Sequence, residues 1–196
     1  MAYNITLEGK NLDAAEKLLA QATSVFESCK VNYWLEGGTL LGLYRENRLL
    51  PWDDDIDISI HNNQGEKIQT LLSTLKENGF RIRIRTFNND SDYFKKGDIR
   101  MIKIRTKHFF GLFKGKVCLD VFIKYTTHDK TYWKIGDKTK NVPSIFYEAF
   151  KTIEFKEKSY QIPKNTEDYL TYRYGEWQTP VKNWDTSKDD KALIPS

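Results

Sequence analysis

The residues in this chain best suited to chemistry are four aspartates within five positions, Asp53, Asp54, Asp55 and Asp57. Carboxylates packed this closely repel one another, and each raises the free-energy cost of ionising its neighbours. Isoleucines at alternate positions of the segment 56–60 predict a strand that presents Asp55 and Asp57 on one polar face, about 6–7 Å apart. A divalent cation would relieve the repulsion, and ligation by oxygen alone favours Mg²⁺ or Mn²⁺. These acids are therefore the first candidates for a metal-dependent catalytic site.

A third acid stands later in the chain, at Asp120. Its neighbours are apolar, so the segment 117–123 is expected to be a mostly buried strand. An acid on such a strand is rarely left without a partner. Asp120 could ligate a metal, accept a proton during catalysis or form a structural salt bridge, and all three roles stay open from the sequence.

Two glycines, Gly37 and Gly38, precede a segment, 39–46, that is expected to be a helix capped by Thr39. Backbone N–H groups at a helix N-terminus form a natural site for an anion. We therefore expect the two glycines and Thr39 to bind phosphate, with a simple turn as the alternative for a lone glycine pair.

Basic residues near these elements are candidates to contact the same phosphate groups. Arg45 lies on the helix expected at 39–46, and Lys103 lies on a strand expected at 99–105. Lys103 and Arg105 share one face of that strand, whereas Arg100 lies on the other. A solvated surface charge is the alternative for each of them.

The order of the elements predicts a sheet with helices on its faces. Apolar residues at helical spacing predict helices over 11–26, 39–46, 65–78 and 167–174, the first capped by Asn11. Alternating apolar residues predict strands over 31–35, 56–60, 80–86, 99–105 and 117–123, with a hairpin over 126–140 and a strand or hairpin over 152–162. This order belongs to an α+β or α/β fold, and we expect an α+β fold with a mixed sheet flanked by helices.

Composition limits the classes of protein. The chain has 196 residues and a formal net charge of +4. We expect a single catalytic domain over 1–182 and a loosely held polar tail over 183–196. The charge suits a phosphorylated ligand but is too small for a nucleic-acid-binding signature. The absence of a long apolar run and of a signal peptide predicts a cytoplasmic protein without a transmembrane segment, which would reach a membrane-borne acceptor peripherally.

Cysteines and histidines give weak signals. Cys29 and Cys118 are expected to be buried small hydrophobic residues, because two thiols cannot form a four-cysteine zinc site. The three histidines have no metal-binding spacing and are expected at the surface: His61, His108 and His128. Among them, His108 is the strongest candidate for acid–base chemistry.

Aromatic residues allow two interpretations. Four of them could form a cage for a quaternary ammonium group by cation–π attraction: Phe109, Phe110, Tyr132 and Trp133. Packing in the core or in a loop is the interpretation that we favour.

A longer pattern resembles a known family. The pattern runs from Glu36-Gly37-Gly38-Thr39-Leu40-Leu41-Gly42 through Arg45 to Pro51-Trp52-Asp53-Asp54-Asp55-Ile56-Asp57-Ile58. It resembles the LicD family, which includes bacterial phosphocholine transferases and fukutin-related ribitol-phosphate transferases. A closing motif of Tyr169-Leu170, Tyr174-Gly175, Trp177 and Pro180 is similar to that family as well.

The resemblance implies a polymerase-beta-like nucleotidyltransferase fold and a CDP-linked donor. It also implies magnesium held by Asp55 and Asp57, with Asp120 as the later acid and Asp53 as a further candidate. The four-cysteine zinc site of some animal members has no counterpart in this chain.

The expected activity is therefore transfer of a phosphocholine-like or ribitol-phosphate-like group. The donor would be CDP- or CMP-activated, the acceptor a hydroxyl of a glycan or glycolipid, and the released product CMP. Two alternatives stay open: a nucleotidyltransferase that adds NMP from an NTP, and a catalytically silent module that binds a nucleotide or carbohydrate.

Overall fold

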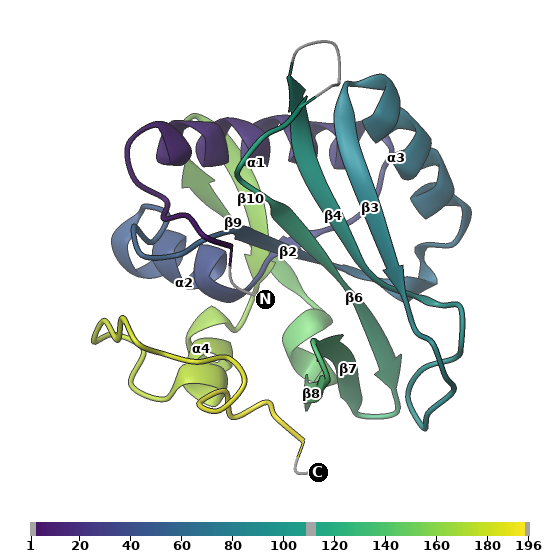
Figure 1. Ribbon diagram of the computed structural model, residues 1–196. Coiled ribbons are helices and arrows are strands. Elements are labelled where there is room, and N and C mark those ends of the chain that lie inside the picture. The colour runs from purple at the N-terminus through teal and green to yellow at the C-terminus, as the bar shows by residue number, and fades with distance from the viewer. Residues whose placement is uncertain (1–2, 109–112, 195–196) are drawn as a thin grey trace.

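An eight-stranded mixed sheet forms the centre of the computed structural model, which describes residues 3–108 and 113–194. Its strand order is β1-β2-β6-β4-β3, with β5 paired to β4 and the β7–β8 hairpin continuing from β6 (Figure 1). The parallel pair is β2–β6, and the other pairings among the described residues are antiparallel. The strands are β1 (Trp34–Leu35), β2 (Ile56–His61), β3 (Phe80–Thr86), β4 (Ile99–His108), β5 (Phe113–Lys114), β6 (Leu119–Thr127), β7 (Lys130–Ile135) and β8 (Lys138–Pro143).

One face of this sheet is apolar and is covered by two helices. Ile58, Val121, Ile102 and Ile84 lie in register across the four central strands, and the first three are fully buried. Helices α1 (Lys10–Ser28) and α3 (Glu66–Glu77) pack on this face with their own apolar stripes (Figure 1). Burial of these apolar surfaces contributes hydrophobic stabilisation to the domain.

The opposite face of the same strands is charged. One position away from the aligned apolar residues, the residues in register across β2, β6, β4 and β3 are Asp57, Asp120, Lys103 and Arg83. Because successive side chains on a strand point to opposite faces, the apolar core on one side determines that these charged groups share the other side.

Two further helices and a second sheet complete the fold. Helix α2 (Gly37–Glu46) joins β1 to β2, and α4 (Thr166–Tyr174) follows a two-stranded sheet of β9 (Phe150–Phe155) and β10 (Lys158–Pro163). Short 3₁₀ helices are η1 (Asn62–Gln64) and η3 (Ser144–Tyr147). The predicted α+β class, with a mixed sheet flanked by helices, is confirmed.

Two helix starts differ from those predicted. Helix α1 begins at Lys10 after Gly9, whose positive φ of 51° turns the chain into the helix before Asn11. Asn11 is therefore not a cap, and its side chain donates to the carbonyl oxygen of Thr6. Helix α2 begins at Gly37 and not at Thr39.

The expectation of a loosely held tail is wrong for the segment 190–193. Asp190 and Ala192 are buried, and Leu193 forms a bridge with Lys140 of β8. Asp190 is held because Lys140 and Arg173 place two cations against its carboxylate. The division into a domain over 1–182 and a tail over 183–196 stays a prediction.

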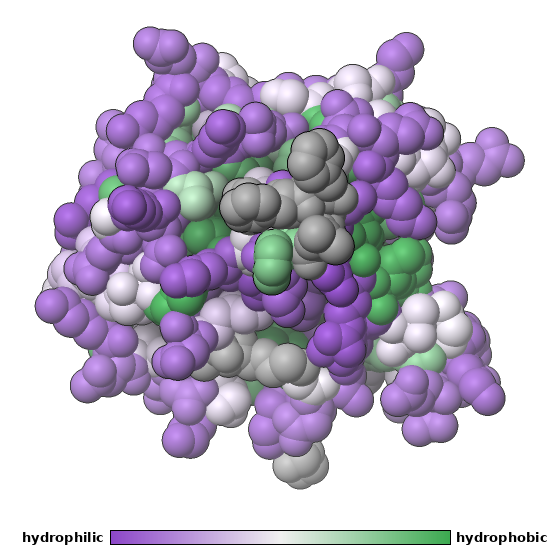
Figure 2. Space-filling model, turned by 45° about the horizontal axis from the view of Figure 1, so that its top comes forward, coloured by the Kyte–Doolittle hydropathy of each residue, from purple (hydrophilic) through white to green (hydrophobic). Residues whose placement is uncertain are grey.

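One face of the molecule is seen to be largely polar (Figure 2). In the view of Figure 2, hydrophilic side chains cover most of the face, and hydrophobic residues show only in patches between them. None of the helices in the described part of the chain is long and apolar enough to cross a bilayer.

Candidate active site

A cavity of about 660 Å³ opens on the charged face of the sheet. The parallel pairing of β2 and β6 places Asp57 opposite Asp120, and β4 places Lys103 on the other side of Asp120. The cavity is lined by all but one of the residues that the sequence predicted for the site: Gly37, Gly38, Arg45, Asp53, Asp55, Asp57, Lys103 and Asp120.

The glycine pair allows two carboxylates to lie against the first turn of α2. A methyl group on Gly37 would collide with Oδ2 of Asp57, and one on Gly38 would collide with Oδ2 of Asp53. Gly37 also has a positive φ of 58°, a conformation that other residues rarely adopt. The N-terminus of α2, which carries partial positive charge, thus faces the protein's own acids.

Thr39 has a different place from the one predicted. Its side chain is buried away from the cavity, and its hydroxyl accepts a hydrogen bond of 2.8 Å from the backbone N–H of Asp57. Glu36, not Thr39, caps α2, because its carboxylate accepts from the N–H of Gly37 at 3.3 Å. The hydroxyl of Thr39 therefore positions Asp57, and the structure does not direct it at a phosphate.

Burial and mutual repulsion raise the pKa values of the clustered acids. The pKa of Asp55 lies well above its usual range because of burial and the nearby Asp120, and that of Asp57 because of burial and Asp55. Burial also raises the pKa of Asp53 to about 6. A group of buried carboxylates that oppose one another's ionisation is the environment in which a divalent cation is most favourable.

The closest group of carboxylates among the described residues differs from the predicted ligand set, which stays a prediction. Asp53, Asp54 and Asp55 can place one oxygen each within 4.8 Å of one another, whereas Asp55, Asp57 and Asp120 do not meet that distance among the described residues. An all-oxygen set still fits Mg²⁺ or Mn²⁺. Asp55 is common to both groups, and Asp53 becomes a stronger candidate than the sequence indicated.

Asp120 is held by three neighbours. Lys103 forms an ion pair with its Oδ2, and the hydroxyl of Tyr3 donates to its Oδ1 at 3.1 Å. The thiol of Cys118 also donates to Oδ1, at 3.0 Å, and burial followed by the charge of Asp120 raises the pKa of this thiol to about 12. Cys118 is buried as predicted, and it is also a partner of the candidate catalytic acid.

Tyr3 was not found from the sequence. Its ring lies beneath the cations of Lys103 and Arg105, at 4.9 and 4.7 Å from the ring centroid, and its backbone N–H donates to Asp54. Nothing in the local sequence pattern around Tyr3 indicates a site. Cys118 could have been placed beside Asp120, because residues two positions apart in an extended segment share a face.

Arg45 connects α2 to the segment after α4. Its guanidinium pairs with Glu46 and donates from Nη1 to the carbonyl oxygen of Trp177 at 2.9 Å. Arg45 still lines the cavity, so it stays a candidate for phosphate contact. Trp177 lines the same cavity. Arg100 does too, although alternation predicted it on the opposite face from Lys103, because the register of β3 and β4 shifts beside it, between Arg85 and Thr86.

A buried charge network lies behind the glycine pair. Glu36 forms ion pairs with Lys124 at 3.1 Å and with Arg173 at 2.8 Å, and it accepts from the hydroxyls of Ser59 at 3.0 Å and Tyr147 at 3.1 Å. Burial alone would raise the pKa of Glu36, but Lys124 and Arg173 outweigh burial and lower it to about 2. Glu36 is therefore ionised at neutral pH.

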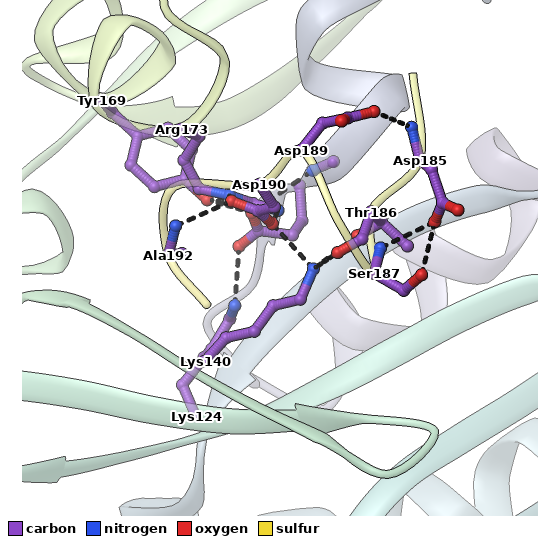
Figure 3. Close-up of polar contacts among 12 residues, drawn as sticks. Lys124, Lys140, Tyr169, Arg173, Asp185, Thr186, Ser187, Asp189, Asp190 and Ala192 are labelled. Carbon is purple, nitrogen blue, oxygen red and sulfur yellow. Dashed lines mark hydrogen bonds and ion pairs between the residues drawn. The ribbon is translucent and has the colours of Figure 1, made fainter. Parts of the chain in front are cut away.

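The network continues into the C-terminal segment, as Figure 3 shows. Arg173 donates from Nε to Asp190 at 3.0 Å, and Lys140 pairs with the same carboxylate at 2.7 Å. Burial lowers the pKa of Lys124 to about 7, because Glu36 only partly compensates for burial and the nearby Arg173 opposes a further positive charge. The ammonium group of Lys124 lies 3.3 Å from the centroid of a ring of Trp133.

The histidines follow the predictions in part. His128 is exposed as predicted, whereas His61 is only partly at the surface, because it packs against Trp34 with ring centroids 4.8 Å apart. The side chain of His108 lies outside the described residues.

The structure describes two of the four residues of the suggested ammonium cage, Tyr132 and Trp133, and these two do not form a cage. Trp133 is buried beneath Lys124, whereas Tyr132 stacks on Tyr93 with ring centroids 4.0 Å apart. Tyr132 and Trp133 are successive on a strand and point to opposite faces. Phe109 and Phe110 lie outside the described residues.

A mixed sheet with acids on its open face, set against a glycine-led helix, defines a nucleotidyltransferase type of domain. Residues 30–165 match the LicD/FKTN/FKRP nucleotidyltransferase domain, which is more than half of the chain. The protein therefore belongs to the LicD family.

Relatives with curated names support the same assignment. The chain is 28% identical to human ribitol-5-phosphate transferase FKTN over 198 residues, covering 93% of this chain and 37% of that protein. It thus spans little more than a third of the length of that relative. It is 44% identical over 41 residues to lipopolysaccharide cholinephosphotransferase LicD of Haemophilus influenzae, covering 21% of this chain and 16% of that protein.

One solved structure is distantly similar to this chain. The structure of ANT(2")-Ia in complex with adenylyl-2"-tobramycin aligns with a TM-score of 0.47 and 17% sequence identity. The alignment covers 87% of this chain and 81% of that chain. A likeness at this level does not bear on activity.

Proposed function

We propose that the protein is an enzyme that transfers a phospho-alcohol group from a CDP- or CMP-activated donor to a hydroxyl group. The transferred group would be phosphocholine-like or ribitol-phosphate-like, and the acceptor a glycan or glycolipid. The observation that carries the proposal is the convergence of Asp53, Asp55 and Asp57 with the first turn of α2 in one cavity. Membership of a family with named ribitol-phosphate and choline-phosphate transferases supports it.

In this proposal the acceptor oxygen attacks the distal phosphorus of the donor. A new P–O bond forms, the bond to the oxygen of CMP breaks, and the acceptor's proton passes to a base. Asp120 is a candidate for this base or for a metal ligand, and Lys103 and Tyr3 hold it in place. Arg45 and Lys103, which line the cavity, would contact the oxygens of the diphosphate.

A divalent cation, Mg²⁺ or Mn²⁺, would neutralise charge on the diphosphate when bound. Asp55 is the residue best placed to hold it, with Asp53, Asp54 and Asp57 beside it and Asp120 on the neighbouring strand β6. The raised pKa values of Asp55 and Asp57 support this assignment, because burial and the neighbouring acids disfavour the charged form of both carboxylates, and a bound cation would offset this.

The test is a donor screen with CDP-choline and CDP-ribitol that measures released CMP and the mass of the product. Asp55→Asn and Asp57→Asn should each lower turnover by roughly 100-fold or more, since each removes charge at the reacting centre. Asp168→Asn makes the same change at an exposed position of α4 and should leave turnover at the wild-type level. Wild-type turnover in both site variants would refute the proposal.

The same assays separate the alternatives. Release of pyrophosphate from an NTP would indicate nucleotidyl transfer, in which the attack falls on the α-phosphorus. Calorimetry that shows metal-dependent binding of the donor, without turnover on any acceptor, would indicate a silent binding module.

A further inference from the structure

A row of three arginines lies on β3, on the same face of the sheet as the acids. Arg81, Arg83 and Arg85 alternate along the strand, so their side chains share one face at intervals of about 6–7 Å. Arg83 is aligned with Lys103, which in turn is aligned with Asp120. The middle of the row is therefore next to Lys103 on the neighbouring strand.

No helix covers this part of the sheet among the described residues, because α1 and α3 pack on the opposite face (Figure 1). Arg81 and Arg83 are exposed, and neither forms an ion pair with a described residue. The acid closest to the row along the register, Asp120, is already paired with Lys103.

Like charges face each other across two neighbouring strands here. Arg81 is directly opposite Arg105, and Arg83 is directly opposite Lys103. Like charges in directly opposed positions destabilise a sheet. Because Asp120 neutralises Lys103, the remaining repulsion falls on the exposed guanidinium groups of Arg81 and Arg83, and a bound anion would relieve it.

The row also enters the cavity. Arg85 lines the cavity together with Arg100. The Nε of Arg100 is buried and has no hydrogen-bond partner among the described residues, while its Nη1 donates to the carbonyl oxygen of Gly136 at 3.0 Å. A buried donor without a partner is costly, and a ligand oxygen in the cavity would satisfy it.

We propose that the arginine row, formed by Arg81, Arg83 and Arg85 with Arg100 at its cavity end, binds an acceptor chain that carries repeated anionic groups. These groups are phosphate or carboxylate, which a guanidinium group binds through two parallel hydrogen bonds. The inference rests on the proposed function, and it adds the chemical class of the acceptor. The row would hold the chain while its terminal hydroxyl lies beside Asp120.

An extended chain fits this surface better than a membrane does. The cations form a single line along one strand that ends inside a cavity, whereas a bilayer needs a broad basic face that it can reach. The lysines of α1 and α3 lie on the other side of the sheet. An anionic membrane surface is therefore a competing outcome of the test.

The test measures binding of three labelled six-unit oligomers by fluorescence anisotropy, without donor or metal. The oligomers are glycerol phosphate, galacturonate and neutral maltohexaose. We expect at least one of the two anionic oligomers to bind and maltohexaose not to bind. The anionic oligomer that binds more tightly identifies the anionic group. The double variant Arg81→Glu, Arg83→Glu should weaken this binding at least tenfold.

A matched control reverses two charges elsewhere. Lys67→Glu with Lys76→Glu changes two exposed residues of α3, on the covered side of the sheet, and should bind the oligomers as the wild type does. Circular dichroism and thermal unfolding confirm that both double variants are folded.

Three results would overturn the proposal: unchanged binding in the arginine double variant, equal loss in the lysine control, or equally tight binding of maltohexaose. Binding to phosphatidylglycerol vesicles that requires Arg81 and Arg83, without binding of either anionic oligomer, would assign the row to a membrane and also overturn it. Since the assay involves no turnover, its failure removes only the acceptor class. Failure of the Asp55 and Asp57 test removes the transferase assignment.

Discussion

Gly38 shows how a missing side chain can shape a site. The carboxylate of Asp53 occupies the space into which a Cβ atom of residue 38 would point. The glycine pair is therefore needed at least as much for the approach of two acids as for the exposure of backbone N–H groups. Gly38, which allows Asp53 to approach α2, is therefore as informative about the site as Asp53 itself.

Gly38→Ala should lower kcat/KM by roughly 100-fold, because Asp53 must move away from the first turn of α2. The thermal midpoint should change little, since alanine is a good helix former and Asp53 can move into the cavity. Steady-state CMP release and thermal unfolding test this. Gly65→Ala is the control, because it strains a positive φ of 49° but meets no atom within 4 Å. A large loss of stability with normal turnover for Gly38→Ala would contradict the prediction.

At the scale of elements, α2 is held at its N-terminus by a buried ionic network. Glu36 accepts from Gly37 N–H and pairs with Lys124 of β6 and Arg173 of α4. Burying these charges is costly, and the structure compensates with several hydrogen bonds to one carboxylate. The orientation of α2, and with it the position of the glycine pair, therefore depends on three elements that are far apart in sequence.

The network predicts a pH dependence of stability. The folded pKa of Glu36 is about 2, below its ordinary value of 4.5, so its contribution is complete above pH 4.5 and is lost as the pH falls towards 2. The loss amounts to about 3 kcal/mol in the free energy of unfolding. Urea unfolding from pH 6 to pH 2.5 measures it.

Glu36→Gln should give a flatter pH profile than the wild type over this range, and a lower stability at pH 6. Glu77→Gln changes an exposed carboxyl group at the end of α3 and should reproduce the wild-type profile. Parallel profiles for wild type and Glu36→Gln would show that Glu36 does not carry the effect.

At the scale of the whole molecule, three distant segments meet around the cavity. Tyr3 comes from the start of the chain, the acids come from its centre, and Arg173 and Trp184 come from its end. Asp190 fastens the last segment, because it pairs with Arg173 and with Lys140. The cavity wall is therefore complete only when both ends of the chain are docked.

Asp190→Asn should destabilise the protein by about 3–5 kcal/mol, because it leaves two buried cations without their acid. Thermal and urea unfolding measure the loss. Asp185→Asn makes the same change in the same segment at a solvent-facing carboxylate, and its effect on stability should be small by comparison. A similar, small effect for both variants would mean that the segment is not docked in solution.

The local pattern of the chain was enough to predict the fold class and most of the acids that line the cavity. The period of two over 56–60 and the apolar flanks of Asp120 were enough to place acids on one face of buried strands. Prediction was possible because alternation along a strand is a local property that the core enforces.

The tertiary structure alone decided which residues surround those acids. No local pattern singled out Tyr3, Lys124 or Lys140, and Arg173 stands between the quoted residues of the closing motif without being one of them. The alignment of Arg83 with Lys103 likewise depends on the register of two strands. Contacts between residues far apart in sequence depend on how all elements pack together, so no local pattern can specify them.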